Sequence, residues 1–323
     1  MSPRLTRLQV LLDAQGLDGL LISHQPNIFY LTGYASRESY LLVAPKKTFF
    51  ITDFRYLEEA KSCLKNIQTA PTNGSLFRTL AGLCAEVKIR RLGFEAKNLN
   101  FAEYQKFKEE LKKIRVNLAP TFDVIEDFRK VKDASEINKI KAAARIAIGA
   151  HRHVLQIAKP GASEREIAAR LEAFMRLSGA QKAGFDIIVA CGAHSSLPHA
   201  LAKDTFIAKD KPLLVDLGAI YRGYNSDLTR VFFLGKMSDT FQRVYSIVKE
   251  AQLRAIRRIV PGVACQEIDA AARNYIRSQG FGANFGHSLG HGLGLEVHEE
   301  PRINAKNEAL LEEGTVFTVE PAI

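Results

Sequence analysis

The chain has 323 residues, of which 46% are hydrophobic and 25% charged, an ordinary balance for a globular protein with large cores. No apolar run approaches the length that crosses a bilayer. The N-terminus has a basic start, but the apolar stretch that follows is broken by Asp13, Gln15 and Asp18, unlike a signal peptide. Four widely spaced cysteines form no CxxC pair and are interpreted as free thiols in a reducing compartment. We therefore expect a cytoplasmic protein with no membrane partner.

The net charge of +10 raises nucleic acid as a partner. The basic residues are scattered along the chain in pairs such as Lys46-Lys47 and Lys112-Lys113, each flanked by apolar residues at helix or strand spacing. This pattern favours solvated faces of ordinary elements over a binding arm. We expect no nucleic-acid partner.

The first third of the chain alternates helix-like and strand-like patterns. An amphipathic stretch at residues 4–15 predicts a helix, and LDGLLIS is a short apolar run without helical period. SYLLVA and TFFIT, separated by PKK, predict a hairpin, and residues 55–64 and 101–111 predict helices. A more polar stretch around Pro120 marks a boundary. The sequence thus predicts a smaller α/β domain over residues 1–122 and a second domain over residues 123–323.

The second domain contains an internal repeat. Pro160-Gly161 and Pro261-Gly262 each follow a helical pattern, at an offset of 101 positions (261 minus 160), and a second helix then opens in both copies. Val215-Asp216 matches Val319-Glu320 at an offset of 104 (319 minus 215). Two copies are too few for a solenoid. We therefore predict one pseudo-symmetric domain with acidic residues on equivalent strands of both halves.

Asp216, Asp227, His291 and Glu320 form a set that divalent first-row metals prefer as ligands. Asp216 and Asp227 lie on either side of the turn-like YRG between two apolar runs, which predicts a hairpin with the carboxylates roughly opposite each other. Asp is also common beside surface turns. A buried, unpaired carboxylate is costly, so a bound cation is the simpler interpretation.

The other two residues of the set have local settings that agree with a buried site. His291 lies between Gly290 and Gly292, which suits close approach of the backbone to a ligand. Glu320 ends the apolar run VFTV, where an unpaired carboxylate would be expensive. Two metals held close together can generate hydroxide at neutral pH and polarise a carbonyl.

Several motifs together resemble a known family. IFYLTGY and FFITDFRYLEEA resemble a creatinase-like N-terminal domain. FDIIVACGAHSSLPHA, VDLGAIYRGYNSDLTR, GHGLGLEVHEEPRI and TVEP resemble four successive motifs of the Xaa-Pro peptidases, the prolidases and aminopeptidases P, within the pita-bread metallopeptidases that include creatinase and methionine aminopeptidase. The resemblance implies an α+β chain, in which a pseudo-symmetric pita-bread catalytic domain follows a smaller α/β creatinase-like domain.

The resemblance also assigns roles to the four metal ligands. Asp216 is expected to bind one metal terminally and Asp227 to bridge both metals. His291 is expected to bind the second metal. Glu320 is expected to bind that metal as well and to handle the proton of the nucleophilic water.

Three further residues acquire roles only through the resemblance. His199 and His298 would contact the scissile carbonyl region of the substrate, and Arg302 would help hold its carboxylate end. From the residues alone, the histidines are equally consistent with surface positions and Arg302 with an ordinary rim charge. The planar fork of Arg302 suits a carboxylate better than Lys would.

The implied function is hydrolysis of the Xaa-Pro bond of peptides or dipeptides by a metal-bound hydroxide. The implied cofactors are two divalent ions, with Mn, Co and Zn all suitable, and a homodimer is expected through the N-terminal domain. Two alternatives stay open. One is a catalytically impaired pita-bread protein that binds peptides or partners, and the other is a metal-independent creatinase-like hydrolase.

The segment after Glu320 bears on the number of metals. Family members carry a further bridging Glu on a return strand, a position that falls beyond residue 323 here, and Ala322 stands where they usually have Gly. Without this bridging Glu, the chain is expected to bind either one metal ion or two. We also expect a chain of this length to be a poor peptidase.

Overall fold

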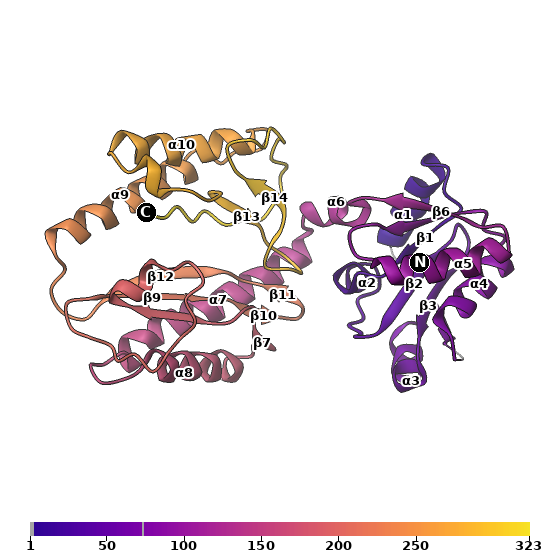
Figure 1. Ribbon diagram of the computed structural model, residues 1–323, viewed down its shortest axis with the longest axis horizontal. Coiled ribbons are helices and arrows are strands. Elements are labelled where there is room, and N and C mark those ends of the chain that lie inside the picture. Colours follow the sequence, from indigo (N-terminus) through magenta and orange to yellow (C-terminus); the bar gives the residue numbers. More distant parts are fainter. Residues whose placement is uncertain (1–2, 73) are drawn as a thin grey trace. The chain divides into compact units, whose positions relative to one another are not determined.

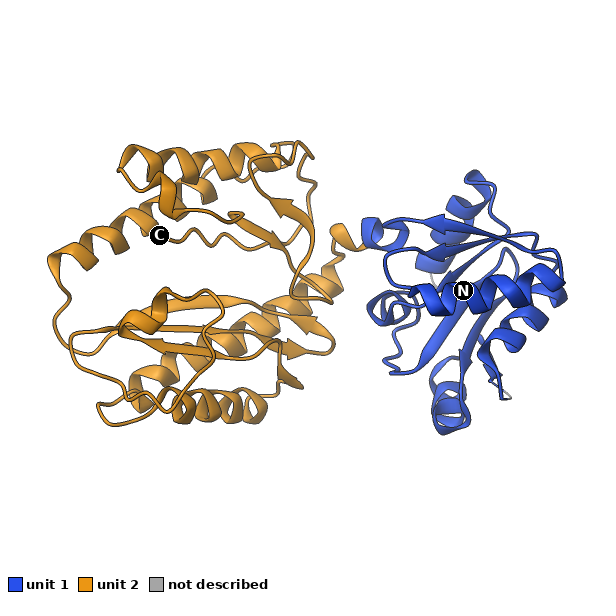
Figure 2. Cartoon of the chain, viewed as in Figure 1, with its two compact units in different colours: residues 1–128 blue, residues 129–323 orange. Residues whose placement is uncertain are grey.

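The computed structural model describes residues 3–72 and 74–323, which form two compact units (Figures 1 and 2). Unit 1 extends to Phe128, and unit 2 extends from Arg129 to Ile323. The sequence predicts a boundary after residue 122, and the structural division falls inside helix α6 (Val124–Lys130). Across the described residues, no helix has both the length and the apolar character needed to cross a membrane.

Unit 1 is an alternating α/β module. Its elements before α6 are α1 (Pro3–Ala14), β1 (Gly19–Ile22), α2 (Gln25–Thr32), β2 (Ser39–Val43), β3 (Thr48–Thr52), α3 (Phe54–Cys63), β4 (Gln68–Pro71), α4 (Leu76–Glu86), β5 (Arg91–Glu95), α5 (Phe101–Lys113) and β6 (Asn117–Thr121). The strands form one sheet in the order β4-β3-β2-β1-β5-β6. Only β2 runs antiparallel to its neighbours among these strands, and its hairpin with β3 confirms the prediction from SYLLVA and TFFIT.

One face of this sheet is covered by α4 and α5. Leu80 of α4 and Phe107 of α5 are fully buried against strand residues such as Phe49 and Leu92. α5 begins with a capping box between Asn100 and Glu103, which satisfies two backbone N–H groups at the helix start. Unit 1 therefore has a hydrophobic core of its own.

Unit 2 consists of two similar halves. The first half contains α7 (Ala134–Ile157), α8 (Glu164–Leu177), β7 (Lys182–Ala183), β8 (Ile188–Cys191), η1 (Gly192–Ser196), β9 (Pro212–Leu217), β10 (Ala219–Tyr221), β11 (Tyr224–Asn225) and β12 (Leu228–Phe233). The second contains α9 (Asp239–Ile256), α10 (Cys265–Ser278), η2 (Gly282–Asn284), β13 (Gly290–Gly292) and β14 (Glu299–Ile303). Each half packs its two long helices against its own strands and forms a separate core.

Hydrogen bonds around α8 and α10 repeat at the offsets seen in the sequence. The Glu164 N–H donates to Thr205 O, and the Cys265 N–H, 101 positions later, donates to Ala309 O, 104 positions later. The bridge between Ser163 and Phe206 has its counterpart between Ala264 and Leu310. The same backbone frame thus occurs twice, as the internal repeat predicts, and the expected α+β pita-bread architecture is confirmed.

The hairpin of the first half places Asp216 and Asp227 on neighbouring segments, roughly opposite each other as the sequence predicts. Asp216 on β9 lies opposite Thr229 on β12, so Asp227 is displaced from the partner position by two residues. Residues two apart on a strand share a face, so the two carboxylates are diagonal neighbours and not direct partners. Gly218 lies between β9 and β10, where a Cβ would collide with the Ser226 carbonyl oxygen.

We predict that Gly218→Ala destabilises unit 2 by about 1–3 kcal/mol, because the hairpin must shift to admit the methyl group. Gly82→Ala is the matched control, since Gly82 lies inside α4 and no atom surrounds the position of its Cβ within 4 Å. The control should stabilise the protein by about 0.4–1 kcal/mol, because alanine favours the helix. Thermal and urea unfolding measure both effects, and equal stability of the Gly218→Ala variant and wild type would contradict the first.

Candidate metal centre

Three of the predicted ligands come together between the two halves of unit 2. One donor atom each from Asp227, His291 and Glu320 lie within 4.8 Å of one another. His291 Nε2 is 3.3 Å from Asp227 Oδ2 and 3.0 Å from Glu320 Oε1. In the part of the chain that the structure describes, no other group of three or more His, Cys, Asp or Glu side chains has this arrangement.

Local hydrogen bonds orient the imidazole and the glutamate. His291 Nδ1 donates to the Gly292 carbonyl at 3.1 Å, which leaves Nε2 free to act as a ligand. The Thr318 hydroxyl donates to Glu320 Oε1 at 2.8 Å, and the His291 N–H donates to the same hydroxyl oxygen at 3.1 Å. Thr318 therefore ties the two ligands of the second half together, a role that the sequence analysis missed.

Asp216, the fourth predicted ligand, borders the same group. Its Oδ1 atom is buried and has no hydrogen-bond partner among the described residues. Burial raises the pKa of Asp216 to about 7, and the charge of Asp227 adds to this effect. An oxygen of this kind is the one a cation would satisfy, because a buried polar atom without a partner is costly.

The pKa shifts of His291 and Glu320 show that the carboxylates around His291 favour a positive charge among them. Burial by itself lowers the pKa of His291, but hydrogen bonds to Asp227 and Glu320 outweigh burial and raise that pKa to about 10. For Glu320, burial raises the pKa, while hydrogen bonds from His291 and Thr318 give a net lowering. The imidazolium thus partly neutralises the carboxylates in the place where a divalent cation would do so.

The two glycines beside His291 lie against neighbouring backbone segments. A Cβ on Gly290 would collide with the Thr318 carbonyl oxygen, and one on Gly292 would collide with the Glu300 carbonyl oxygen. Both glycines therefore allow a close approach of neighbouring backbone segments. This packing brings the segment with Glu320 against β13, where the Glu320 N–H donates to Leu289 O.

Two of the predicted substrate residues lie beside His291. The His298 ring contacts the His291 ring edge to face, with 4.2 Å between centroids. Burial, together with the charges of His291 and Arg302, lowers the pKa of His298, which favours the neutral ring. Arg302 on β14 pairs directly with His291 on β13, so the two side chains share a face of the hairpin.

His199 lies in the irregular segment after η1 and is exposed. Its ring makes no hydrogen bond or ion pair with any residue that the structure describes. The structure therefore does not place His199 in the cluster formed by Asp227, His291 and Glu320. Its predicted contact with substrate stays a prediction.

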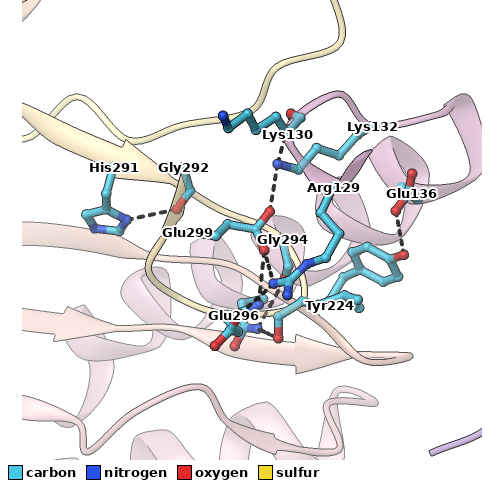
Figure 3. A network of polar contacts seen from close by, with 12 residues as sticks. Arg129, Lys130, Lys132, Glu136, Tyr224, His291, Gly292, Gly294, Glu296 and Glu299 are labelled. Atoms are coloured by element: carbon cyan, nitrogen blue, oxygen red, sulfur yellow. Dashed lines mark hydrogen bonds and ion pairs between the residues drawn. The ribbon is translucent and has the colours of Figure 1, made fainter. Parts of the chain in front are cut away.

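A buried ionic network holds the segment that carries His298 (Figure 3). Arg129 Nη2 lies 2.7 Å from Glu296 and 2.6 Å from Glu299, and Lys132 Nζ lies 2.7 Å from Glu299. The side chains of Arg129, Lys132 and Glu299 are each less than a tenth exposed. This network fixes the residues on either side of His298 to the end of α6 and to the segment that precedes α7.

Asn225 adds a second link between the halves. Its amide nitrogen donates to the carbonyl oxygens of Gly294 at 3.1 Å and Leu295 at 2.9 Å. The first half therefore holds the loop that follows His291 through a side chain two residues before Asp227. Neither this link nor the ionic network follows from sequence spacing, because their members come from distant parts of the chain.

Comparisons with known proteins agree with the geometry of this site. Residues 138–323 match Metallopeptidase family M24, and residues 4–131 match the Creatinase/Prolidase N-terminal domain. The chain belongs to metallopeptidase family M24. The resemblance inferred from its motifs is thereby confirmed.

Relatives of this M24 protein include enzymes named for the Xaa-Pro bond. The Xaa-Pro dipeptidase of Pyrococcus horikoshii is 35% identical over 100% of this chain and 90% of its own length. A solved Xaa-Pro dipeptidase from Bacillus anthracis has a TM-score of 0.94 and 39% identity, covering 98% of this chain and 89% of its own. An X-Pro aminopeptidase from Thermotoga maritima has a TM-score of 0.89 and 36% identity, covering 98% and 90% respectively.

The residues present fit the divalent metal that the family implies. The donor set combines carboxylate oxygens with one imidazole nitrogen, a mixture that suits divalent first-row ions. The unpartnered Oδ1 of Asp216 and the raised pKa of His291 both indicate that positive charge is missing from the site. The cluster is thus a candidate centre for a metal that the M24 domain would hold between its halves.

We predict that binding of Mn²⁺ at pH 7 releases roughly one to two protons, since ligands must be deprotonated to bind. Without metal, His291 (pKa about 10) is protonated and Asp216 (pKa about 7) is partly protonated at this pH. Both groups lose their protons as pH rises, so Mn²⁺ affinity should increase between pH 6 and 8. Calorimetric titration in two buffers of different ionisation enthalpy measures the release, and identical heats in both buffers would refute the prediction.

We predict that Glu299→Ala lowers the free energy of unfolding of unit 2 by roughly 3–5 kcal/mol, because Arg129 and Lys132 would be left buried without this carboxylate. Glu172→Gln is the control, since it removes an exposed partner of Arg176 and should cost less than about 1 kcal/mol. Chemical denaturation measures both variants. A Glu299→Ala variant as stable as the control would show that the network adds nothing to the fold.

Proposed function

We propose that this M24 protein is a metal-dependent exopeptidase that hydrolyses the bond before proline in peptides or dipeptides. The observation that carries the proposal is the convergence of Asp227, His291 and Glu320 within 4.8 Å, with the unpartnered Oδ1 of Asp216 at its border. The names of the relatives at 35–39% identity supply the substrate class. A divalent cation bound there supplies Lewis acidity toward a carbonyl and lowers the pKa of water.

Glu320 is the residue suited to hold and move a proton. Its side chain is 38% exposed, so water and substrate can reach it, while its Oε1 atom stays fixed by the Thr318 hydroxyl. Its lowered pKa keeps it ionised at neutral pH, ready to accept a proton from the attacking water. Proton transfer to the departing proline nitrogen then completes hydrolysis.

His298, His199 and Arg302 are proposed to act on the substrate. The neutral His298 ring can donate a hydrogen bond to the reacting carbonyl oxygen, where charge develops in the transition state. His199 would supply a second donor from its exposed segment. Arg302, exposed on the same hairpin face as His291, offers a planar fork for the carboxylate end of a short substrate.

The number and identity of the metals belong to the proposal as well. Asp216, Asp227, His291 and Glu320 suit Mn, Co or Zn, and the positions of Asp216 and Asp227 as diagonal neighbours allow one ion or two. The peptide partner, the homodimer and the cytoplasmic location stay predictions. The two alternatives from the sequence, peptide binding without hydrolysis and metal-independent hydrolysis, are separated by the following experiment.

The test is hydrolysis of Ala-Pro, a longer Xaa-Pro peptide, and the matching Ala-Ala peptides with Mn²⁺, Co²⁺ or Zn²⁺. Cleavage should be confined to the proline peptides, disappear on chelation and return with metal. Asp227→Asn should lower kcat/KM by at least about 100-fold, because it removes a direct ligand and not only a supporting residue. Metal counting by mass spectrometry gives the number of ions per chain.

Each failure has a distinct meaning. Binding of Ala-Pro without cleavage under every metal condition would favour the non-hydrolysing alternative. Full activity after chelation, with metal content verified as zero, would favour the metal-independent hydrolase. The relative rates on the dipeptide and the longer peptide distinguish dipeptidase from aminopeptidase.

A further inference from the structure

A buried glutamate at the start of α8 has no part in the chemistry described so far. The Glu164 side chain is fully buried, and its Oε1 accepts a hydrogen bond from the Cys191 N–H at 2.8 Å. Its Oε2 accepts one from the Lys203 N–H at 3.1 Å. These two backbone groups mark the beginning and the end of the segment that contains His199.

His194 reinforces this arrangement from within the segment. Its Nδ1 donates to the same carboxylate, 3.0 Å from Oε1 and 2.9 Å from Oε2. The His194 side chain is only 11% exposed, so this contact is largely shielded from water. Hydrogen bonds to a buried carboxylate are among the stronger ones in proteins. One carboxylate therefore fixes residues 191, 194 and 203 at the same time.

The internal repeat supplies a comparison within the molecule. Cys265 occupies the position equivalent to Glu164, and the backbone hydrogen bonds of both residues match across the repeat. The second half thus builds the same helix start and the same return of the chain with a thiol in place of the carboxylate. The fold of the repeat does not require Glu164, so its carboxylate serves the segment to which it is hydrogen-bonded, which is the one that contains His199.

We propose that Glu164, assisted by His194, is a positioning residue that holds His199 in place for the reaction. This inference rests on the proposed function, because it gives His199 its role toward the substrate. The segment contains only the short η1 helix as regular structure, and a misplacement of a substrate-contacting group by about 1 Å can cost on the order of 100-fold in rate. Three contacts to one buried carboxylate limit such movement.

The experiment is a double-mutant cycle with Glu164→Gln and His199→Ala. Glutamine keeps the size of the side chain but turns one acceptor oxygen into an N–H₂ group, which cannot accept from a backbone N–H. Glu164→Gln should lower kcat on Ala-Pro by roughly 10–100-fold with metal content unchanged. In the His199→Ala background the same substitution should change kcat by no more than about twofold, because the residue it positions is already gone.

Glu166→Gln is the matched control. It removes the same charge from the same turn of α8, but Glu166 is exposed and pairs with Arg170. Its activity should equal that of wild type within about twofold, since exposed ion pairs contribute little. If Glu164→Gln does not fold, His194→Gln enters the cycle in its place, and the same lack of additivity is expected with a smaller loss.

The outcomes separate this inference from the proposed function. A wild-type enzyme that cleaves Ala-Pro, combined with equal losses from Glu164→Gln in both backgrounds, would overturn the positioning role alone. So would a loss of bound metal in Glu164→Gln that accounts for its lower kcat. A wild-type enzyme without activity under any metal condition would overturn the proposed function and this assignment together.

Discussion

Concentrated negative charge is the constraint around which unit 2 is organised. Asp227 and Glu320 approach the same imidazole nitrogen, and Asp216 adds a buried oxygen without a hydrogen-bond partner in the described structure. Like charges this close raise the pKa of one another, and burial adds to the cost. The high pKa of His291 shows how strongly the site favours positive charge. A divalent cation would neutralise more of this negative charge than the single proton on His291 does.

The duplicated scaffold explains how such charges are brought together. Each half packs two helices on its own strands, so the segments that bear the ligands rest on two separate cores. The halves are then joined by polar contacts, including those of Asn225 with the loop after His291. Arg129 and Lys132 fix that loop again through Glu299. Rigid support on both sides keeps the ligand positions from relaxing apart, as electrostatic repulsion would otherwise favour.

The halves differ where their functions differ. The second half brings backbone segments close at Gly290 and Gly292, which aligns Glu320 beside His291. In the first half, the buried carboxylate of Glu164 instead accepts hydrogen bonds from both ends of the segment that contains η1 and His199. A duplicated frame can diverge in this way because its backbone hydrogen bonds leave the side chains at equivalent positions free to change. Comparison of the two halves is therefore a source of functional inference inside a single chain.

The sequence by itself determined the family, the α+β pita-bread architecture and the internal repeat, since motifs, turn residues and helix periodicity are local properties. It also named the residues that meet at the centre, because Asp227, His291 and Glu320 each lie in a recognisable local pattern. The register of Asp216 and Asp227 follows from the two-residue turn at Arg222-Gly223, since strand pairing on both sides of Gly218 keeps one register. The network around Glu299, in contrast, was decided by contacts between segments more than 160 positions apart, Arg129 and Glu296 among them. The hydrogen bonds of Glu164 with Cys191, His194 and Lys203 likewise join residues that are distant in sequence. Such contacts depend on how packed layers meet, and periodicity carries no information about that.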